Sequence, residues 1–288
     1  MREQRTAKHA SAWHEVSGSK RRVGGLLSLA LAALLAAGCT SEETVPNEPA
    51  QPTKIPFEAT LAAPGESETR TVYEEAGDQI NVSWKSGDRI GLSIDDFPVT
   101  SELKVLKVSS DGTASLTGDI TITYDMNEDG TIDFTAKEGD AVTLEYPAST
   151  STGDFKAQEG TLSYIAEKLD MISGTSTLTI SAGKASLADK VQMKSGIGIW
   201  KLTLQDSESN PLSATRVSVR TPSGVWFGTT DITATSTVYL GFVPYKYGTM
   251  DNVYIEATVG GDTYVTAKKA ITLEKGKYYQ STVKMTKE

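Results

Sequence analysis

Cys39 is the only cysteine in the chain, and the residues around it indicate a covalent modification. It follows Leu35–Gly38 (LAAG), a run of small and apolar residues that resembles a bacterial lipobox. In a lipobox the cysteine thiol takes a diacylglycerol group. Leu usually stands three places before the cysteine, whereas here Ala36 stands there and Leu35 comes one place earlier. We expect cleavage between Gly38 and Cys39 and lipidation of Cys39. The alternative is an ordinary signal peptide with a chance cysteine.

The residues before Cys39 are organised as an export signal. Residues 1–22 carry six Lys and Arg against two Glu, and Val23–Ala37 is a run of 15 mostly apolar residues. A membrane-spanning helix needs about 18 or more such residues, so the run indicates a signal peptide over residues 1–38. Residues 39–54 are rich in Pro, Glu and Thr and predict a disordered tether.

The lipid and the tether together predict where the protein is held. A diacylglycerol plus an N-acyl group anchors a protein far better than one acyl chain. The acidic segment Thr40–Glu43 resembles the surface-export signal of Bacteroidales-type lipoproteins, with a solvated linker as the alternative. We therefore expect a protein anchored in the outer membrane and exposed at the cell surface.

Residue types missing from the mature chain exclude several kinds of chemistry. Both histidines, His9 and His14, lie in the predicted signal peptide, and the one cysteine is predicted to carry lipid. The mature chain thus lacks the residues for an intrachain disulfide, a Cys/His zinc site or a Ser-His-Asp triad. No spacing marks a catalytic pair of carboxylates, so we expect no enzyme. Without residues 1–38 the chain has 22 Lys and Arg against 35 Asp and Glu, and this charge of −13 argues against nucleic acid as a partner.

One acidic loop has the spacing of a calcium site. The oxygen ligands would come from Asp125, Asn127, Asp129, the Thr131 carbonyl and Asp133, with a glycine at the sharp turn. The bidentate acid of a full calcium loop is missing at the twelfth position, and the flanking segments resemble strands rather than helices. The alternative is a hairpin turn that happens to be acidic, and no other cofactor is predicted.

Apolar residues alternate with polar ones along most of the mature chain. This period of two predicts half-buried strands, the first of them over Ile55–Leu61. Glycine turns separate the strands, and the pair Gly260-Gly261 predicts a tight hairpin. Only Ser163–Met171 has the spacing of a brief helix. The pattern predicts an all-β fold with two β-sandwich domains, 55–190 and 191–288.

Several motifs in order resemble the fimbrillin family of Bacteroidales-type pilin lipoproteins. Trp84–Gly91 (WKSGDRIG) is similar to the family's W-x-x-G-D-x-I-G segment, and Glu68–Thr71 (ETRT) precedes it. Near the end, Leu273–Tyr279 followed by Thr282–Met285 resembles the family's G-K-x-Y hairpin and final strand. The resemblance implies two tandem transthyretin-like sandwich domains, related to the immunoglobulin-like architecture.

The resemblance also implies a function. A protease would remove an N-terminal segment after an arginine, and the opened groove would accept a strand from another fimbrial subunit. Arg70 is the best placed candidate for this cleavage, although an exposed arginine without processing is the simpler interpretation. The chain would serve as a pilus subunit or an accessory adhesin that contacts a host or bacterial surface ligand.

The alternative function is a stand-alone surface lipoprotein that binds glycans through aromatic side chains. Trp84 and Trp200 lie within alternating runs and are expected in the core. The more exposed candidates are Trp226, Tyr245 and Tyr247.

Overall fold

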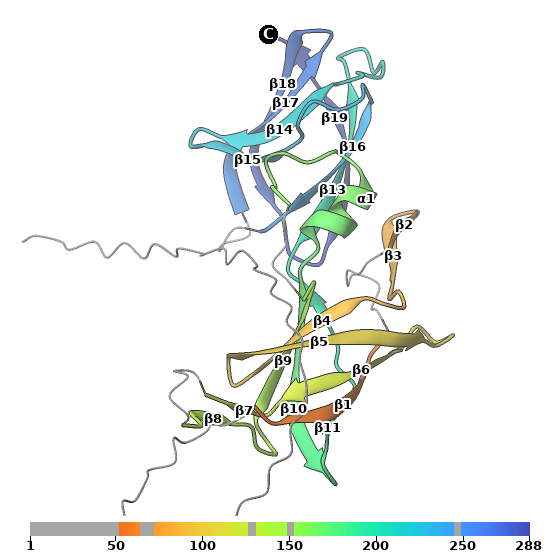
Figure 1. The fold of residues 1–288 in the computed structure, drawn as a ribbon. Helices are drawn as coiled ribbons and strands as arrows, with labels where there is room; N and C mark the ends of the chain where they lie inside the picture. Colours follow the sequence, from red (N-terminus) through yellow and green to blue (C-terminus); the bar gives the residue numbers. More distant parts are fainter. Residues whose placement is uncertain (1–51, 64–71, 126–130, 149–152, 245–248) are drawn as a thin grey trace, which may run out of the picture. The chain divides into compact units, whose positions relative to one another are not determined.

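The computed structural model describes residues 52–63, 72–125, 131–148, 153–244 and 249–288. These residues form an all-β fold, as the alternating pattern predicted (Figure 1). The first half of the chain contributes twelve strands to the fold: β1 (Lys54–Leu61), β2 (Val72–Ala76), β3 (Gln79–Ser83), β4 (Arg89–Ile94), β5 (Phe97–Val108), β6 (Ala114–Thr121), β7 (Thr123–Tyr124), β8 (Phe134–Thr135), β9 (Ala141–Tyr146), β10 (Ile172–Ser181), β11 (Lys184–Leu187) and β12 (Lys194–Ser195).

The second half begins directly after β12. Its strands are β13 (Gly198–Gln205), β14 (Arg216–Thr221), β15 (Gly224–Gly228), β16 (Thr237–Phe242), β17 (Thr249–Val259), β18 (Asp262–Thr272), β19 (Tyr278–Lys284) and β20 (Thr286–Lys287). A brief helix, α1 (Leu162–Tyr164), stands between β9 and β10 and continues as the π-helical turn η1 (Ile165–Leu169). Thr161 caps it by accepting a hydrogen bond from the Tyr164 N–H.

Most strands of the first half belong to one sheet that closes on itself. The order is β11-β1-β6-β5-β4-β9-β10, and an additional pairing of β10 with β11 completes a ring of seven strands. Strand β12 extends the sheet beside β10. One apolar cluster joins side chains from around this ring, among them Phe57, Ile90, Leu116 and Leu144. The predicted sandwich is therefore not confirmed in this half, because a ring leaves no second sheet to pack against.

The second half has two sheets around one core. The orders are β16-β13-β19 and β15-β14-β17-β18-β20. Leu202 and Leu240 from the first sheet share an apolar cluster with Val219 and Ile255 from the second. The inward residues alternate with outward polar ones, as expected where only one face of each sheet is buried. The two halves of the chain thus have separate cores, although two tandem sandwich domains are not confirmed.

Local signals in the sequence located several turns and ends correctly. Gly260 and Gly261 both have positive φ, 59° and 91°, and join β17 to β18 as a two-residue hairpin. The first strand begins at Lys54, one residue inside the predicted tether. The predicted boundary at Lys190 stays a prediction, and β12 still pairs with β10 beyond it. Within the described ranges no helix is long and apolar enough to cross a membrane.

The last strands are predicted to be integral to the second core. Val283 and Met285 are each 1% exposed, whereas Thr282 and Lys284 face solvent. Replacing Val283 and Met285 with Ala together should lower the free energy of unfolding by about 4 kcal/mol or more, since buried truncations cost about 2–5 kcal/mol each. The matched control, Ala at Thr282 and Lys284, should change it by about 0.5 kcal/mol or less. Urea denaturation measures both, and equal midpoints for the two variants would contradict the assignment.

Candidate functional site

Strand β1 closes the ring of the first half with its apolar side chains. Its sequence KIPFEATL alternates, and Phe57 and Leu61 are both fully buried. Ile55 and Ala59, on the same face, pack against the same apolar cluster. Full burial of a Phe or Leu side chain contributes about 1.5–3 kcal/mol each, so this strand supplies a substantial part of the core.

The backbone pairing of β1 is unequal on its two sides. Antiparallel pairing with β6 runs along the whole strand, from Lys54 opposite Thr121 to Leu61 opposite Ala114. On the other side the parallel pairing with β11 covers Phe57 and Glu58. Val191 extends it past β11, since its N–H donates to the Thr60 carbonyl at 3.0 Å and its carbonyl accepts from the Ala62 N–H at 2.9 Å. Strand β11 does not depend on β1, because four register pairs also hold it to β10. We define the β1 slot as the facing edges of β6 and β11 together with the core space that Phe57 and Leu61 fill.

The Trp84–Gly91 motif lies at the end of β1. The Trp84 indole N–H donates to the Ala62 carbonyl over 3.4 Å, and the ring meets Tyr146 edge-on at 6.3 Å. The turn that follows is fixed by the Asp88 carboxylate, which accepts the Lys85 N–H at 2.7 Å. Gly87 has a φ of 94°, which suits glycine in this turn. The motif therefore fastens the end of the first strand rather than carrying out chemistry.

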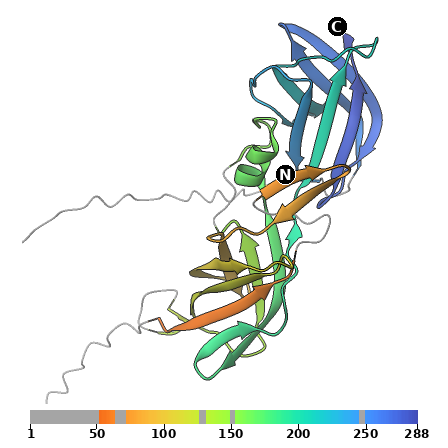
Figure 2. The ribbon, with the colours of Figure 1, turned by 90° about the vertical axis from the view of Figure 1, so that its right-hand side faces the viewer.

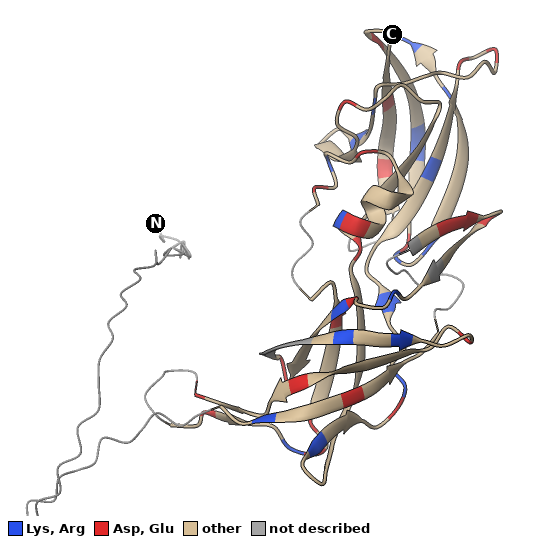
Figure 3. Ribbon diagram, turned by 45° about the vertical axis from the view of Figure 1, so that its right-hand side comes forward, with Lys and Arg blue, Asp and Glu red and all other residues tan. Residues whose placement is uncertain are grey.

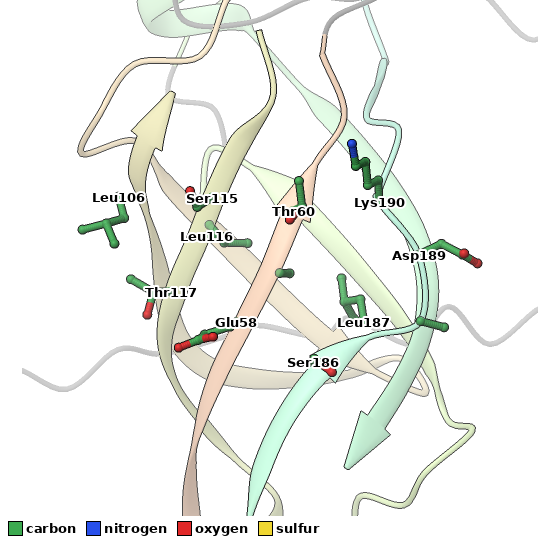
Figure 4. Close-up of a pocket in the computed structure, with 12 residues that line it drawn as sticks. Glu58, Thr60, Leu106, Ser115, Leu116, Thr117, Ser186, Leu187, Asp189 and Lys190 are labelled. Atoms are coloured by element: carbon green, nitrogen blue, oxygen red, sulfur yellow. The ribbon is translucent and has the colours of Figure 1, made fainter. Parts of the chain in front are cut away.

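A shallow groove of about 590 Å³ lies over the outer face of β1 (Figure 4). Its central residues are Glu58 and Thr60 from β1, with hydroxyl groups from β6 and β11 beside them. Leu106 lies at its margin and is 65% exposed, because a bulge in β5 places it outside the regular register. The groove mixes hydroxyls, charges and one exposed apolar side chain. Among the residues that the structure describes, no three His, Cys, Asp or Glu gather as metal ligands.

Several predicted site residues fall outside the described residues. These are Gly38, Cys39, Arg70, Asn127 and Asp129, so the lipidation, maturation and calcium predictions stay predictions. The described members of the calcium loop, Asp125, Thr131 and Asp133, lie in the connection between β7 and β8, where the Asp133 N–H donates to the Tyr124 carbonyl at 2.9 Å.

The aromatic residues proposed for glycan binding do not gather on one surface in the described part of the chain. Trp84 belongs to the core of the first half and Trp200 to that of the second. Trp226 is partly buried against the second core and donates to the Thr221 hydroxyl at 2.9 Å. Tyr245 and Tyr247 lie outside the described residues.

The structure also contains a polar cluster that the sequence did not reveal. The Glu75 carboxylate on β2 accepts from Lys201 Nζ at 2.5 Å, from the Tyr239 hydroxyl at 2.5 Å and from the Tyr278 hydroxyl at 2.9 Å. We call these four residues the Glu75 cluster. Lys201 Nζ also lies 5.6 Å from the centre of the Tyr239 ring. Their separations along the chain, 126 to 203 residues, leave no local signal by which a single sequence could reveal the cluster.

Electrostatics within the Glu75 cluster favour the charged carboxylate. The hydrogen bonds from Lys201 and then Tyr239 hold the pKa of Glu75 below its ordinary value of 4.5, and partial burial opposes this shift. The same contact with Glu75 raises the pKa of Lys201. Burial, followed by the hydrogen bond to Glu75, raises the pKa of both Tyr239 and Tyr278.

Comparison with known proteins adds the following. No family model matches the chain, and no curated protein matches it. A proposed cell adhesion protein from Bacteroides ovatus is 14% identical with a TM-score of 0.45, over 83% of this chain and 96% of its own. A second, from Bacteroides fragilis, is 12% identical with a TM-score of 0.45, over 82% and 97%. A fimbrial protein from Bacteroides ovatus is 14% identical with a TM-score of 0.37, over 81% and 49%.

The lowered pKa of Glu75 predicts how stability depends on pH. A carboxylate whose pKa is lower in the folded state stabilises that state above its unfolded pKa, and the contribution is lost as pH falls through the folded value. Wild-type protein should therefore exceed Glu75→Gln in unfolding free energy at pH 7, and the difference should shrink below about pH 4.5. Urea denaturation across this range measures it. The control is Glu74→Gln at the exposed neighbouring position, and a constant Glu75 difference from pH 7 to pH 3 would contradict the prediction.

Proposed function

We propose that this chain is a fimbrillin-like surface lipoprotein that works as a fimbrial subunit or accessory adhesin and assembles by β-strand exchange. The observation that carries the proposal is the position of β1. It is the first described strand, and it fills the core with Phe57 and Leu61. Its pairing on the β11 side is shorter than its pairing with β6, because it consists of two residues opposite β11 and a bridge to Val191.

Strand exchange needs a slot that survives when its own strand leaves. Strands β6 and β11 keep their other partners, β5 and β10, after removal of β1. Their freed backbone groups would then offer hydrogen bonds to an incoming strand, and the two spaces left by Phe57 and Leu61 would set its register. A strand with apolar residues four positions apart meets both spaces, because alternate side chains point to the same face.

The proposed maturation site lies close to this strand. Arg70 follows β1 by nine residues and precedes β2 by two. Cleavage there would separate the lipid-bearing tether and β1 from the rest of the chain. The proposal includes no catalytic step by this protein, and its partners are other subunits and a surface ligand.

Anchoring at the outer membrane is part of the same proposal. The lipid on Cys39 would hold the uncleaved protein at the cell surface, and residues 40–53 would give the folded part reach away from the bilayer. A protein held this way stays near other copies, which favours assembly by raising the effective concentration.

Cleavage at Arg70 is predicted to start assembly. Mature protein treated with a limiting amount of an arginine-specific protease should release the segment that ends at Arg70 and then form ladders of oligomers. Mass spectrometry and native gels, read on the same samples, measure the two steps. The Arg70→Gln variant should lose both.

A peptide competition makes the mechanism specific. Excess peptide of sequence Lys54–Leu61 should refill the slot and stop growth, whereas the same peptide with Phe57→Ala and Leu61→Ala should not. Chain that is cut at Arg70 yet stays monomeric would exclude strand exchange. Chain that stays intact and monomeric would favour a stand-alone adhesin or glycan binder.

Lipidation at Cys39 is predicted to determine membrane attachment. In cells that process lipoproteins, the full chain should incorporate labelled palmitate and sediment with outer membranes, and surface protease should reach it. Cys39→Ser should abolish labelling and release the protein from the membrane fraction, because the chain has no other thiol. Retention of the label in the Cys39→Ser variant would exclude the predicted site.

A further inference from the structure

The β2–β3 hairpin is a two-stranded sheet of its own. Val72 to Ala76 pair with Gln79 to Ser83, and in the part of the chain that the structure describes neither strand pairs with another sheet. An isolated two-stranded hairpin is at best marginally stable in water. Its order therefore requires contacts with other parts of the protein.

The apolar face of the hairpin supplies one set of contacts. Tyr73 and Ile80 are 9% and 6% exposed, and they share a third apolar cluster with Ile165 and Leu169 of η1 and Ile199 of β13. This cluster is separate from the cores of the two halves. Figure 2 shows the hairpin, in orange, beside the strands of the second half.

Polar contacts fix the hairpin on one particular face of the β16-β13-β19 sheet. Lys201 stands opposite Tyr239 on one side and Gln280 on the other, and these residues face away from the core that holds Leu202. Glu75 meets this face through the Glu75 cluster. Gln280 Nε2 adds a hydrogen bond of 2.6 Å to the Gly77 carbonyl at the hairpin turn.

The two sets of contacts have different roles. The side chains of Lys201 and Glu75 are 21% and 24% exposed, so water and salt weaken their attraction. Burial of Tyr73 and Ile80 contributes most of the affinity. The Glu75 carboxylate accepts from three donors, and only one placement of the hairpin on the sheet satisfies all three. These hydrogen bonds therefore fix the orientation of the hairpin rather than its affinity. Figure 3 shows the acidic residues of the hairpin in red.

We propose that the β2–β3 hairpin is an intramolecular latch, and that the face of the β16-β13-β19 sheet with Lys201, Tyr239, Tyr278 and Gln280 is its docking surface. The latch connects a segment beside the β1 slot to the second half of the chain. The hairpin that docks belongs to the same copy, because short segments of chain link it to its neighbours. Residues 62–71 connect it to β1, and Trp84–Asp88 connect it to β4.

The latch has anchors that β1 does not share. Its contacts go to η1, β13, β16 and β19, whereas β1 is held by β6, β11, Val191 and Trp84. The hairpin therefore keeps its docking contacts whether or not β1 occupies its slot. This inference does not depend on the proposed function, because the latch is defined in the uncut chain.

Zero-length cross-linking tests the latch directly. A water-soluble carbodiimide activates the Glu75 carboxylate, the Lys201 amine attacks it, and an amide forms while the reagent leaves as a urea. Because Nζ and Oε1 lie 2.5 Å apart, the uncut monomer should yield this amide as a main product in peptide mass spectrometry. The Lys201→Arg variant keeps the charge without a reactive amine and should lose the product.

Hydrogen exchange provides a second measurement on the same protein. Glu75→Gln should speed exchange of the β2–β3 amides by about twofold to tenfold while β13 and β17 stay protected. The matched control is Glu74→Gln, one position along the strand, which should leave the hairpin rates unchanged. Lys201→Arg should also retain most of the protection.

The outcomes separate clearly. A Glu75–Lys201 amide within monomers, together with faster exchange in Glu75→Gln alone, supports the latch. Amide-linked dimers would mean that the hairpin docks on a second copy, and no amide would mean that it does not dock, so either result would overturn the proposal. Because all readings use uncut protein, failure of the latch and failure of the strand-exchange proposal are distinguishable.

Discussion

The fold of the first half depends on the closure of its sheet by β1. An open sheet has two edges with unpaired N–H and C=O groups, and each edge can pair with another chain. Here β6 and β11 would be those edges, and β1 pairs with both. The same strand fills the core with Phe57 and Leu61, so the hydrogen-bonding constraint and the packing constraint fall on one segment of eight residues. Removal of β1 would therefore leave both backbone edges and core space open at once.

Because a single strand closes the sheet, the other strand pairings of the first half do not involve β1. The remaining pairings form a continuous path from β6 through β5, β4, β9 and β10 to β11, and none of them includes β1. The core of the second half is a separate cluster built on Leu202, Val219 and Ile255. Under the proposed exchange, a vacancy at β1 would leave these pairings and the second core in place. Exposed backbone edges beside apolar spaces favour pairing with a further strand, which is the physical basis of polymerisation by exchange.

The sequence predicted the local structure well and the long-range pairing poorly. Alternation predicted β1 over Ile55–Leu61, and Gly260-Gly261 predicted its hairpin, because side-chain period and turn chemistry are encoded in adjacent residues. The closed ring was not predicted, since it depends on β11 meeting both β1 and β10, and no periodicity specifies which strands become neighbours. The Glu75 cluster was missed for the same reason. In the sequence Glu75 is one acidic residue among many, and only the fold brings Lys201 and Tyr278 to it.

The β1 strand and the β2–β3 hairpin follow each other directly in the sequence, and their contacts are connected. Between Leu61 and Arg89 the chain leaves the ring, forms the β2–β3 hairpin and returns to the ring as β4. Trp84, near the end of this segment, contacts its start, because the indole N–H donates to the Ala62 carbonyl just after β1. The hairpin between them packs on the second half through Tyr73, Ile80 and Glu75. In the proposed exchange these contacts of the hairpin and of Trp84 would hold the segment in place while β1 is exchanged. Loss of β1 would remove the Ala62 contact from Trp84, while the Trp84 ring would keep Tyr146 as a neighbour. Under the proposed exchange, β1 is the strand that is replaced and the β2–β3 hairpin is the segment that stays, and Arg70 lies between the two in the sequence.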